Sequence, residues 1–278
     1  MKKIAIIPTL FTLGNGVCGF GAITFAARIS RDTMLDPQEI NWLWFSGLMI
    51  LAAMVFDMLD GRVARLTRWT SDFGGQLDSL CDVISFGIAP AFLLLKLCSD
   101  SDHIKDNSLW VKGLWIIAVL YVVCAAMRLA RFNVENDHSP DSHLWFKGLP
   151  SPAAAGAIAS AAILRYELRD PPFDHILSWL SIDPRHVEQL LDIGLPLAAV
   201  GLAVLMVSRV PYPHWANQIL KGRHNFSHLV RIVLGGVAIV LLRQLAVPLV
   251  FWAFVLRGPL ALLRNRLRHR QVTEQPVA

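Results

Sequence analysis

The sequence predicts an all-α fold, a polytopic bundle of membrane-spanning helices, and two observations about its 278 residues support this prediction. Hydrophobic residues account for 54% of the chain and charged residues for only 17%, whereas an ordinary soluble domain is about one quarter charged. The apolar residues are also concentrated in long runs, and several of these runs reach the roughly 20 residues that a helix needs to cross a bilayer. This combination is typical of an integral membrane protein.

Eight apolar segments are predicted to form the helices of the bundle. Their approximate spans are 4–28, 41–65, 73–98, 109–132, 149–166, 190–209, 227–242 and 245–263. Only Arg243 and Gln244 separate the last two segments, so one long bent helix is an alternative to two separate helices. The stretches between the segments contain no separate soluble domain.

Basic residues alternate between the two sides of the predicted membrane. If the N-terminus, with Lys2 and Lys3, lies in the cytoplasm, the even-numbered gaps between helices also face the cytoplasm. These gaps contain Arg65, Arg68, Arg128, Arg131, Lys147, Arg209, Lys221 and Arg223, whereas the gaps on the other side are balanced or acidic. Cytoplasmic loops of membrane proteins are enriched in Lys and Arg. We therefore expect a multi-pass protein of the cytoplasmic (inner) membrane with both termini in the cytoplasm.

The net charge of +5 indicates contact with membrane lipid and not with nucleic acid. No basic stretch is interleaved with aromatic residues, and the C-terminal sequence RNRLRHR fits contact with anionic lipid. The four cysteines include no C-x-x-C pair, and His224 and His228 lack a third ligand nearby. Neither a disulfide framework nor a zinc site is therefore predicted.

Four aspartates lie at regular spacing at the junction of the second and third predicted helices. Asp57 and Asp60 are three residues apart, and Asp78 and Asp82 are four residues apart. Each pair therefore shares a helix face. The link between the two helices is short, which predicts antiparallel neighbours whose cytoplasmic ends lie together. The four carboxylates are expected to form one cluster at that end.

Carboxylates clustered beside hydrocarbon need a cation, because an uncompensated acid at membrane depth costs about 2.5 kcal/mol or more. Mg²⁺ and Mn²⁺ prefer oxygen ligands and bridge carboxylates to substrate phosphates. Two such ions clamp a phosphoryl group for displacement. The spacing excludes a calcium-binding EF-hand loop, whose ligands alternate along a loop. The pattern therefore predicts a site for divalent metal and phosphate.

Small and basic residues beside the aspartates fit a phosphate site. Gly61 and Gly74 leave room for a phosphate to approach the backbone. Ala64 is predicted on the same helix face as Asp57. Arg65 supplies a guanidinium group whose forked geometry suits phosphate.

The full motif, D-x2-D-G-x2-A-R-x8-G-x3-D-x3-D, runs from Asp57 to Asp82 with all eight fixed positions present. It resembles the signature of the CDP-alcohol phosphotransferases. Within that family the chain is most similar to the bacterial phosphatidylserine synthases of the integral-membrane type. The supporting stretches are IPTLFTLGNGVCGF, GRVARLTRWTSDFGGQLDSLCDVISFGIAPA, MRLARFNV, FKGLPSPAAAG and LMVSRVPYP, spread from about residue 8 to residue 213.

The resemblance implies a reaction. Enzymes of this family are bundles of membrane helices that bind two divalent metals, and they transfer a phosphatidyl-type group from a CDP-linked lipid to an alcohol, releasing CMP. For this chain it implies CDP-diacylglycerol and L-serine as substrates, Mg²⁺ or Mn²⁺ as cofactors, and a homodimer. It also implies a catalytic membrane domain of six helices over 1–220. Two further helices and a basic cytoplasmic tail occupy 221–278.

The resemblance also assigns roles to individual residues. It makes Asp82 the general base that accepts the proton of the attacking hydroxyl. The implied metal ligands are Asp57, Asp60, Asp78 and Asp82, and the implied contacts to the CDP-lipid are Gly61, Ala64, Arg65, Ser71 and Gly74.

Serine recognition has several candidate residues. A bound serine needs a cation for its carboxylate and acceptors for its ammonium group. Candidates at the cytoplasmic ends of the fourth and fifth predicted helices, level with the aspartates, are Arg128, Arg131, Asn133, Lys147 and Ser151. Each of them is also explained as a topology-setting charge or a helix cap.

Two alternative functions remain open at this point. The first keeps the chemistry and changes the alcohol to glycerol phosphate, inositol phosphate or choline, although the RLARFN and GLPSPAA stretches favour serine. The second is a cation transporter that uses the same acids. Transporters often contain broken helices in paired halves, and the sequence contains no such duplication.

Overall fold

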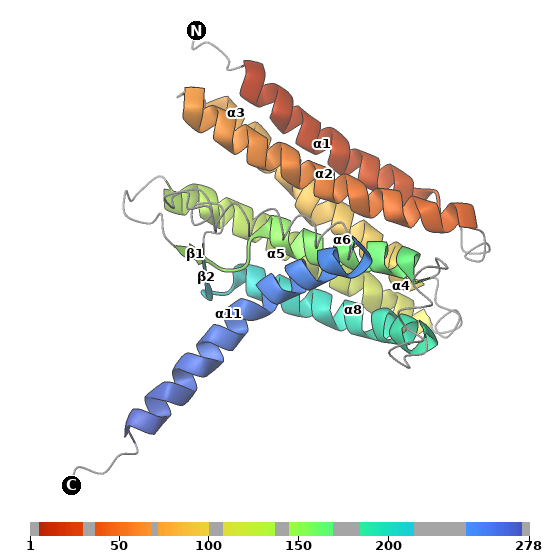
Figure 1. Cartoon of the computed structure of the whole chain (residues 1–278). Helices are drawn as coiled ribbons and strands as arrows, with labels where there is room; N and C mark the ends of the chain where they lie inside the picture. Colours follow the sequence, from red (N-terminus) through yellow and green to blue (C-terminus); the bar gives the residue numbers. More distant parts are fainter. Residues whose placement is uncertain are drawn as a thin grey trace, which may run out of the picture.

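The computed structural model describes residues 6–29, 37–67, 72–99, 108–136, 145–168, 184–213 and 243–273. The helices are α1 (Ile6–Ala27), α2 (Pro37–Thr67), α3 (Asp72–Asp82), the π-helix η1 (Val83–Ile88), α4 (Ala89–Ser99), α5 (Ser108–Asn136), α6 (Ser151–Glu167), α8 (Pro184–Val207) and α11 (Arg243–Thr273). Two short strands, β1 (Trp145–Lys147) and β2 (Pro211–Pro213), accompany them. The described part of the chain forms a helical bundle, with α11 projecting from one side (Figure 1).

The helices agree with the predicted segments to within a few residues at most ends. The predicted helix over 73–98 is one continuous rod in which η1 joins α3 to α4. The α11 helix is ten residues longer at its C-terminal end than the predicted helix over 245–263. The predicted helix over 227–242 lies outside the described residues. The two strands were not predicted, because three residues are too few to show an alternating pattern.

Five helices of the described chain are long and apolar enough to cross a membrane. These segments are Pro8–Ala27, Asn41–Ala64, Phe73–Ser99, Leu109–Val134 and His186–Val207. The α6 helix has only 17 residues, and the apolar part of α11 covers Ala246–Leu262. The chain is therefore a helical membrane protein with five candidate membrane spans among the described residues, and the predicted total of eight is not confirmed.

The α1 helix packs closely on α2 and on the rod formed by α3 and η1 (Figure 1). Glycines permit this approach. A Cβ atom added at Gly16 would lie 2.9 Å from the sulfur of Cys81, and one added at Gly19 would lie 2.7 Å from the Cα atom of Ser85. Small residues at helix interfaces of membrane proteins let backbones come together in this way. The approach brings the polar face of α1 against the aspartate-bearing helices.

The α6 helix is the most buried helix of the bundle. Every residue from 154 to 163 is buried, and most of them are alanines. Gly47 of α2 meets it closely, since an added Cβ would lie 2.9 Å from the carbonyl oxygen of Ala159. The small side chains of α6 therefore allow the surrounding helices to pack tightly around it.

The strands β1 and β2 pair antiparallel at the end of the bundle where α6 begins (Figure 1). Gly148 follows β1 with a φ of 92°, a conformation that side chains other than glycine rarely adopt. A Cβ at this position would also lie 2.5 Å from the carbonyl oxygen of Met206. The backbone N–H of Gly148 donates to the Val210 carbonyl at 2.8 Å. This turn fixes the start of α6 against the end of α8.

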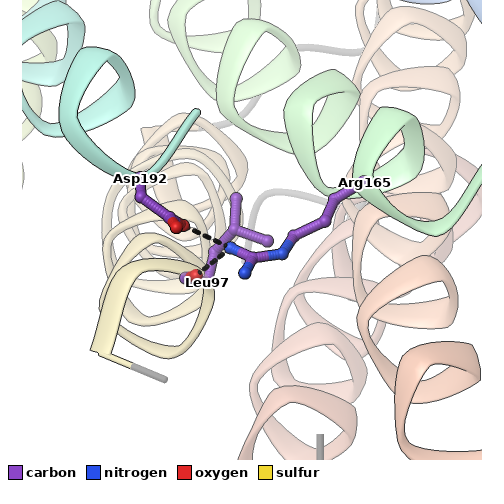
Figure 2. Close-up of polar contacts among 3 residues, drawn as sticks. All are labelled: Leu97, Arg165 and Asp192. Carbon is purple, nitrogen blue, oxygen red and sulfur yellow. Dashed lines mark hydrogen bonds and ion pairs between the residues drawn. The ribbon is translucent and has the colours of Figure 1, made fainter. Parts of the chain in front are cut away.

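An ion pair connects helices at the other end of α6, where Arg165 lies in the last turn, and Figure 2 shows its contacts. Arg165 of α6 donates to the carboxylate of Asp192 on α8 at 2.7 Å and to the carbonyl of Leu97 at 2.6 Å. Leu97 lies in the last turn of α4, whose carbonyl groups lack partners within the helix. The guanidinium group therefore connects three helices.

Candidate active site and metal centre

Three of the four predicted aspartates form a compact group. One carboxylate oxygen each from Asp57, Asp78 and Asp82 lies within 4.8 Å of the other two. Asp57 lies on α2, and the other two lie on α3. Figure 1 shows the end of α2 and the start of α3 at the same end of the molecule. The predicted convergence of the two helices on one acidic cluster is therefore present.

Asp60 lies beside this group and not within it. It interacts electrostatically with Asp57 and Asp78, and it is buried, with 7% of its surface exposed. The hydroxyl of Thr12 on α1 donates a hydrogen bond to Oδ2 of Asp60. In the structure the fourth predicted ligand is thus engaged with α1, one helical turn from Asp57.

A second α1 side chain holds Asp82. Nδ2 of Asn15 donates to Oδ1 of Asp82 at 2.8 Å. Asn15 is completely buried, and its backbone carbonyl accepts a hydrogen bond from Ser85 Oγ at 2.9 Å. Thr12 and Asn15 are three residues apart, so they share one helix face. The α1 helix therefore supplies a polar wall to the acidic cluster.

These two α1 residues were missed in the sequence. Thr12 and Asn15 are neutral, and neutral polar residues occur in membrane helices without a functional role. The available signal was their spacing of three within an apolar segment that also contains the small residues Gly16 and Gly19. That combination indicates a helix face packed against another helix.

The residues of the cluster fit a divalent metal ion. Oδ1 of Asp78 is buried and has no hydrogen-bond partner among the described residues. Among the described residues, Arg128 of α5 interacts electrostatically with Asp57 and Asp82, and one guanidinium does not balance four acids. Carboxylate oxygens are the ligands that Mg²⁺ and Mn²⁺ prefer. The cluster can therefore hold such an ion, chiefly through Asp57, Asp78 and Asp82.

The predicted serine-binding candidates lie around the cluster on different elements. Nη1 of Arg128 donates to Oγ of Ser151 at 2.8 Å, at the start of α6. Nη1 of Arg131 reaches instead the Val207 carbonyl at the end of α8, at 3.4 Å. The structure therefore joins Arg128 and Ser151 beside the aspartates and directs Arg131 toward a neighbouring helix.

The remaining candidates for serine and donor binding are placed only in part. Asn133 donates to Oγ of Ser79 at 2.8 Å, one residue beyond Asp78. The backbone of Lys147 pairs with Pro211 in the strand ladder. Gly61, Ala64 and Gly74 are half-buried at the end of α2 and the start of α3, whereas Ser71 and the side chains of Arg65 and Lys147 lie outside the described structure.

A π-helical turn follows Asp82 directly. The turn η1 spans Val83–Ile88, and Ser85, Phe86 and Gly87 within it are buried. The hydroxyl of Tyr121 on α5 donates to the Phe86 carbonyl at 3.3 Å. Such turns occur frequently at functional sites. Here the turn begins immediately after the last aspartate of the cluster.

Comparisons with known proteins give matches that cover much of the chain. Residues 5–183 match the model of a family described as CDP-alcohol phosphatidyltransferase. A relative from Mycobacterium tuberculosis is 26% identical over 265 residues, covering 95% of this chain and 80% of its own. One from Helicobacter pylori is 31% identical over 215 residues, covering 77% and 75%.

A third relative, from Methanocaldococcus jannaschii, is 34% identical over 171 residues, covering 62% of this chain and 65% of its own. All three relatives are named CDP-diacylglycerol–serine O-phosphatidyltransferase. The family match includes the four aspartates and extends from the start of α1 beyond the end of α6.

Proposed function

This chain belongs to the CDP-alcohol phosphatidyltransferase family, and from that premise we propose that it transfers the phosphatidyl group of CDP-diacylglycerol to the hydroxyl of L-serine. The products are phosphatidylserine and CMP. The observation that carries the proposal is the group of three carboxylates within 4.8 Å of one another, with Arg128 nearby. The choice of serine follows the names of the relatives.

We assign the proton transfer to Asp82. A serine hydroxyl is a poor nucleophile until a positioned base accepts its proton. Asn15 holds one oxygen of Asp82, which restricts how the carboxylate can turn. Asp82 then takes the hydroxyl proton as the serine oxygen bonds to the phosphorus, and the bond from phosphorus to the CMP oxygen breaks.

The four aspartates are assigned to metal binding as well. Asp57, Asp78 and Asp82 would hold Mg²⁺ or Mn²⁺ together, with Asp60 completing a site for two ions. When bound, the ions neutralise negative charge on the pyrophosphate and on the departing CMP. The unpartnered Oδ1 of Asp78 supports this assignment.

Donor and acceptor are assigned to different sides of the cluster. Gly61, Ala64, Arg65, Ser71 and Gly74, along the junction of α2 and α3, would contact the CDP-lipid. The serine carboxylate would bind on the α5–α6 side, where Arg128 meets Ser151. Further assigned contacts to serine are Arg131, Asn133 and Lys147.

The proposed setting is the cytoplasmic face of the cytoplasmic membrane, where free serine and CDP-diacylglycerol meet. The basic gaps in the sequence support this orientation. We further propose a homodimer in which residues 1–220 form the catalytic membrane domain. Residues 221–278 would form additional membrane helices and a basic tail in contact with anionic lipid.

One experiment tests the reaction and its two alternatives. Purified protein is mixed with CDP-diacylglycerol, Mn²⁺ or Mg²⁺ and one alcohol from a panel of serine, glycerol phosphate, inositol phosphate and choline, and CMP release is followed. We expect release with serine, loss of release with excess chelator, and recovery when metal is restored.

The outcomes separate the alternatives. CMP release with a different alcohol alone would replace serine as the acceptor. Full activity in excess chelator would contradict the metal assignment. Absence of CMP release with every alcohol, together with metal-dependent cation flux in vesicles, would favour a transporter that uses the same acids.

A further inference from the structure

The α11 helix contains an internal proline that removes one backbone hydrogen bond of the helix. A residue from another element supplies a hydrogen bond in its place. In an α-helix the N–H of each residue donates to the carbonyl four residues earlier. Pro259 has no N–H, so the carbonyl of Val255 lacks its usual partner. The hydroxyl of Tyr212 on β2 donates to that carbonyl at 3.0 Å. The Tyr212 hydroxyl therefore supplies the hydrogen bond that this carbonyl cannot receive within the helix.

The contact between Tyr212 and α11 is close and buried. A Cβ atom added at Gly258 would lie 2.4 Å from the Tyr212 ring, so glycine is required there. The Tyr212 ring also lies 5.7 Å from that of Phe254, and Tyr212 is completely buried. Burial raises the pKa of Tyr212 to about 12, so its hydroxyl remains a donor at physiological pH.

Tyr212 connects α11 to the segment that leads into α6. It pairs with Phe146 across the two strands, and Lys147 pairs with Pro211. The Gly148 N–H then bonds to the Val210 carbonyl, and the Leu149 N–H bonds to the Leu205 carbonyl. Three residues after Gly148 comes Ser151, the partner of Arg128. The strand pairing and these backbone hydrogen bonds therefore hold the segment that leads to Ser151, beside the aspartates.

We propose that Tyr212 is a positioning residue for the acceptor alcohol. By docking β2 on α11 it fixes β1, and β1 fixes Lys147 and the start of α6. This inference rests on the proposed function, because it takes the side of the cluster formed by α5 and α6 as the serine side. It goes beyond that function by assigning a role in catalysis to α11, which carries none of the motif residues.

The same geometry predicts that the effect is selective. The described hydrogen bonds that hold the aspartates join α1, α2, α3 and η1, and the electrostatic interaction of Arg128 with Asp57 and Asp82 comes from α5. None of these contacts involves Tyr212 or α11. Loosening the strands should therefore alter serine binding and leave donor and metal binding intact.

The test replaces Tyr212→Phe, which removes the hydroxyl and keeps the ring. We expect the KM for serine to rise about five- to tenfold, as for loss of one positioned hydrogen-bonding group, with the KM for CDP-diacylglycerol within twofold of the parent value. The matched control is Ser46→Ala. It also removes one buried hydrogen bond from a side chain to a backbone carbonyl, that of Ala22 at 2.8 Å, in the α1–α2 pair. Neither KM should change in the control.

A second variant separates positioning from stability. Pro259→Ala in the Tyr212→Phe background returns an N–H to the Val255 carbonyl, which restores the helix hydrogen bond without reattaching β2. The serine KM should stay raised in this double variant while thermal stability recovers. If the serine KM returns to the parent value, or if Tyr212→Phe raises both KM values equally, the proposal is overturned.

Failure of the proposed function would be recognisable in the same measurements. If the parent protein uses another alcohol, the serine assignment falls, and the Tyr212→Phe comparison is made with that alcohol. A selective rise in its KM would support the positioning role, and an unchanged KM would overturn it.

Discussion

Neutral side chains of α1 hold two of the four aspartates. Asn15 donates to Asp82, and Thr12 donates to Asp60, so each of these carboxylates has a fixed partner on α1. Asp78 retains a buried oxygen with no partner among the described residues. The carboxylates are therefore not equivalent, and this difference gives a basis for separating the base from the metal ligands.

The first prediction concerns Asp82→Asn. Loss of a general base costs about 10²–10⁴-fold in rate, whereas the neighbouring acids remain to bind metal. We expect this variant to bind CDP-diacylglycerol and at least one divalent ion, measured by titration, but to release almost no CMP when serine is added. Asp78→Asn serves as the comparison, and it should lose metal binding together with activity.

Two results would contradict this assignment. Near-normal turnover by Asp82→Asn would remove it as the base. If Asp78→Asn instead bound donor and metal normally and failed only in turnover, the proton transfer would belong to Asp78.

The aspartates could be predicted from the sequence, and their α1 partners could not. Spacings of three and four place acids on one helix face wherever the helix lies, so Asp57 and Asp78 were predictable from local geometry. Which helix packs against them depends on contacts between residues that are distant in sequence. The bond from Asn15 to Asp82 joins residues 67 positions apart, and no local pattern encodes it.

Close packing of α1 on the π-helical turn brings these two elements together beside Asp82. A Cβ at Gly19 would lie 2.7 Å from the Ser85 backbone, whereas one at Gly21 would lie 3.7 Å from the flexible side chain of Met49. The first contact cannot be accommodated without movement, and the second is ordinary van der Waals contact. The two glycines therefore have different tolerances on one helix.

The second prediction compares Gly19→Ala with Gly21→Ala. The Gly19 variant should push α1 away from η1 and weaken the hydrogen bond from Asn15 to Asp82, lowering kcat about tenfold. The Gly21 variant should keep the parent kcat. Equal activity of both variants in the CMP-release assay, at equal thermal stability, would show that the approach of α1 does not control the site.

At the opposite end of the bundle, the pair of Arg165 and Asp192 stabilises the contact of α6 with α8. Both side chains are almost completely buried, at 6% and 8% exposed. Removing one member of a buried pair leaves an uncompensated charge and costs about 3–5 kcal/mol, whereas replacing both members with apolar residues is often neutral. We therefore expect the protein to lose stability when one member of the pair is removed and to keep most of it when both members are replaced.

The third prediction follows from that asymmetry. Arg165→Met should lower the free energy of unfolding by about 3–5 kcal/mol, and Arg165→Met combined with Asp192→Leu should recover most of the loss. Thermal unfolding in detergent measures both. If the double variant is no more stable than the single one, the buried charge of Asp192 is not the cause of the loss. The KM values of both variants should match the parent, because the pair lies far from the aspartates.

For the whole molecule, periodicity and apolar runs in the sequence were sufficient to locate the helices. They were not sufficient to establish how many of the helices cross the membrane. The α6 helix was predicted as an apolar segment over 149–166, and its residues from 154 to 163 are buried within the protein, because neighbouring helices cover it. Burial against protein and burial against lipid have the same sequence signal. The strand pair was also hidden, since it depends on Gly148 and Tyr212, which are far apart in sequence.

The last prediction tests the orientation of the whole molecule. The α5 helix spans Ser108–Asn136 and contains one of the five candidate membrane spans. Ser101 precedes it and Ser139 follows it, both outside the described residues, so a membrane-crossing α5 places them on opposite sides. The aspartate cluster lies at the end where α5 finishes, which the basic gaps assign to the cytoplasm.

A cysteine introduced at Ser139 should react with a membrane-impermeant thiol reagent only in inverted vesicles, and one introduced at Ser101 only in intact cells. The unmodified parent is the control for labelling of the native cysteines. Of these, Cys81, Cys98 and Cys124 are buried and Cys18 is half-buried. Labelling of both positions from the same side would mean that α5 does not cross. The reverse pattern would place the aspartates outside the cell, away from cytoplasmic serine, and the proposed reaction could not be supplied with its acceptor.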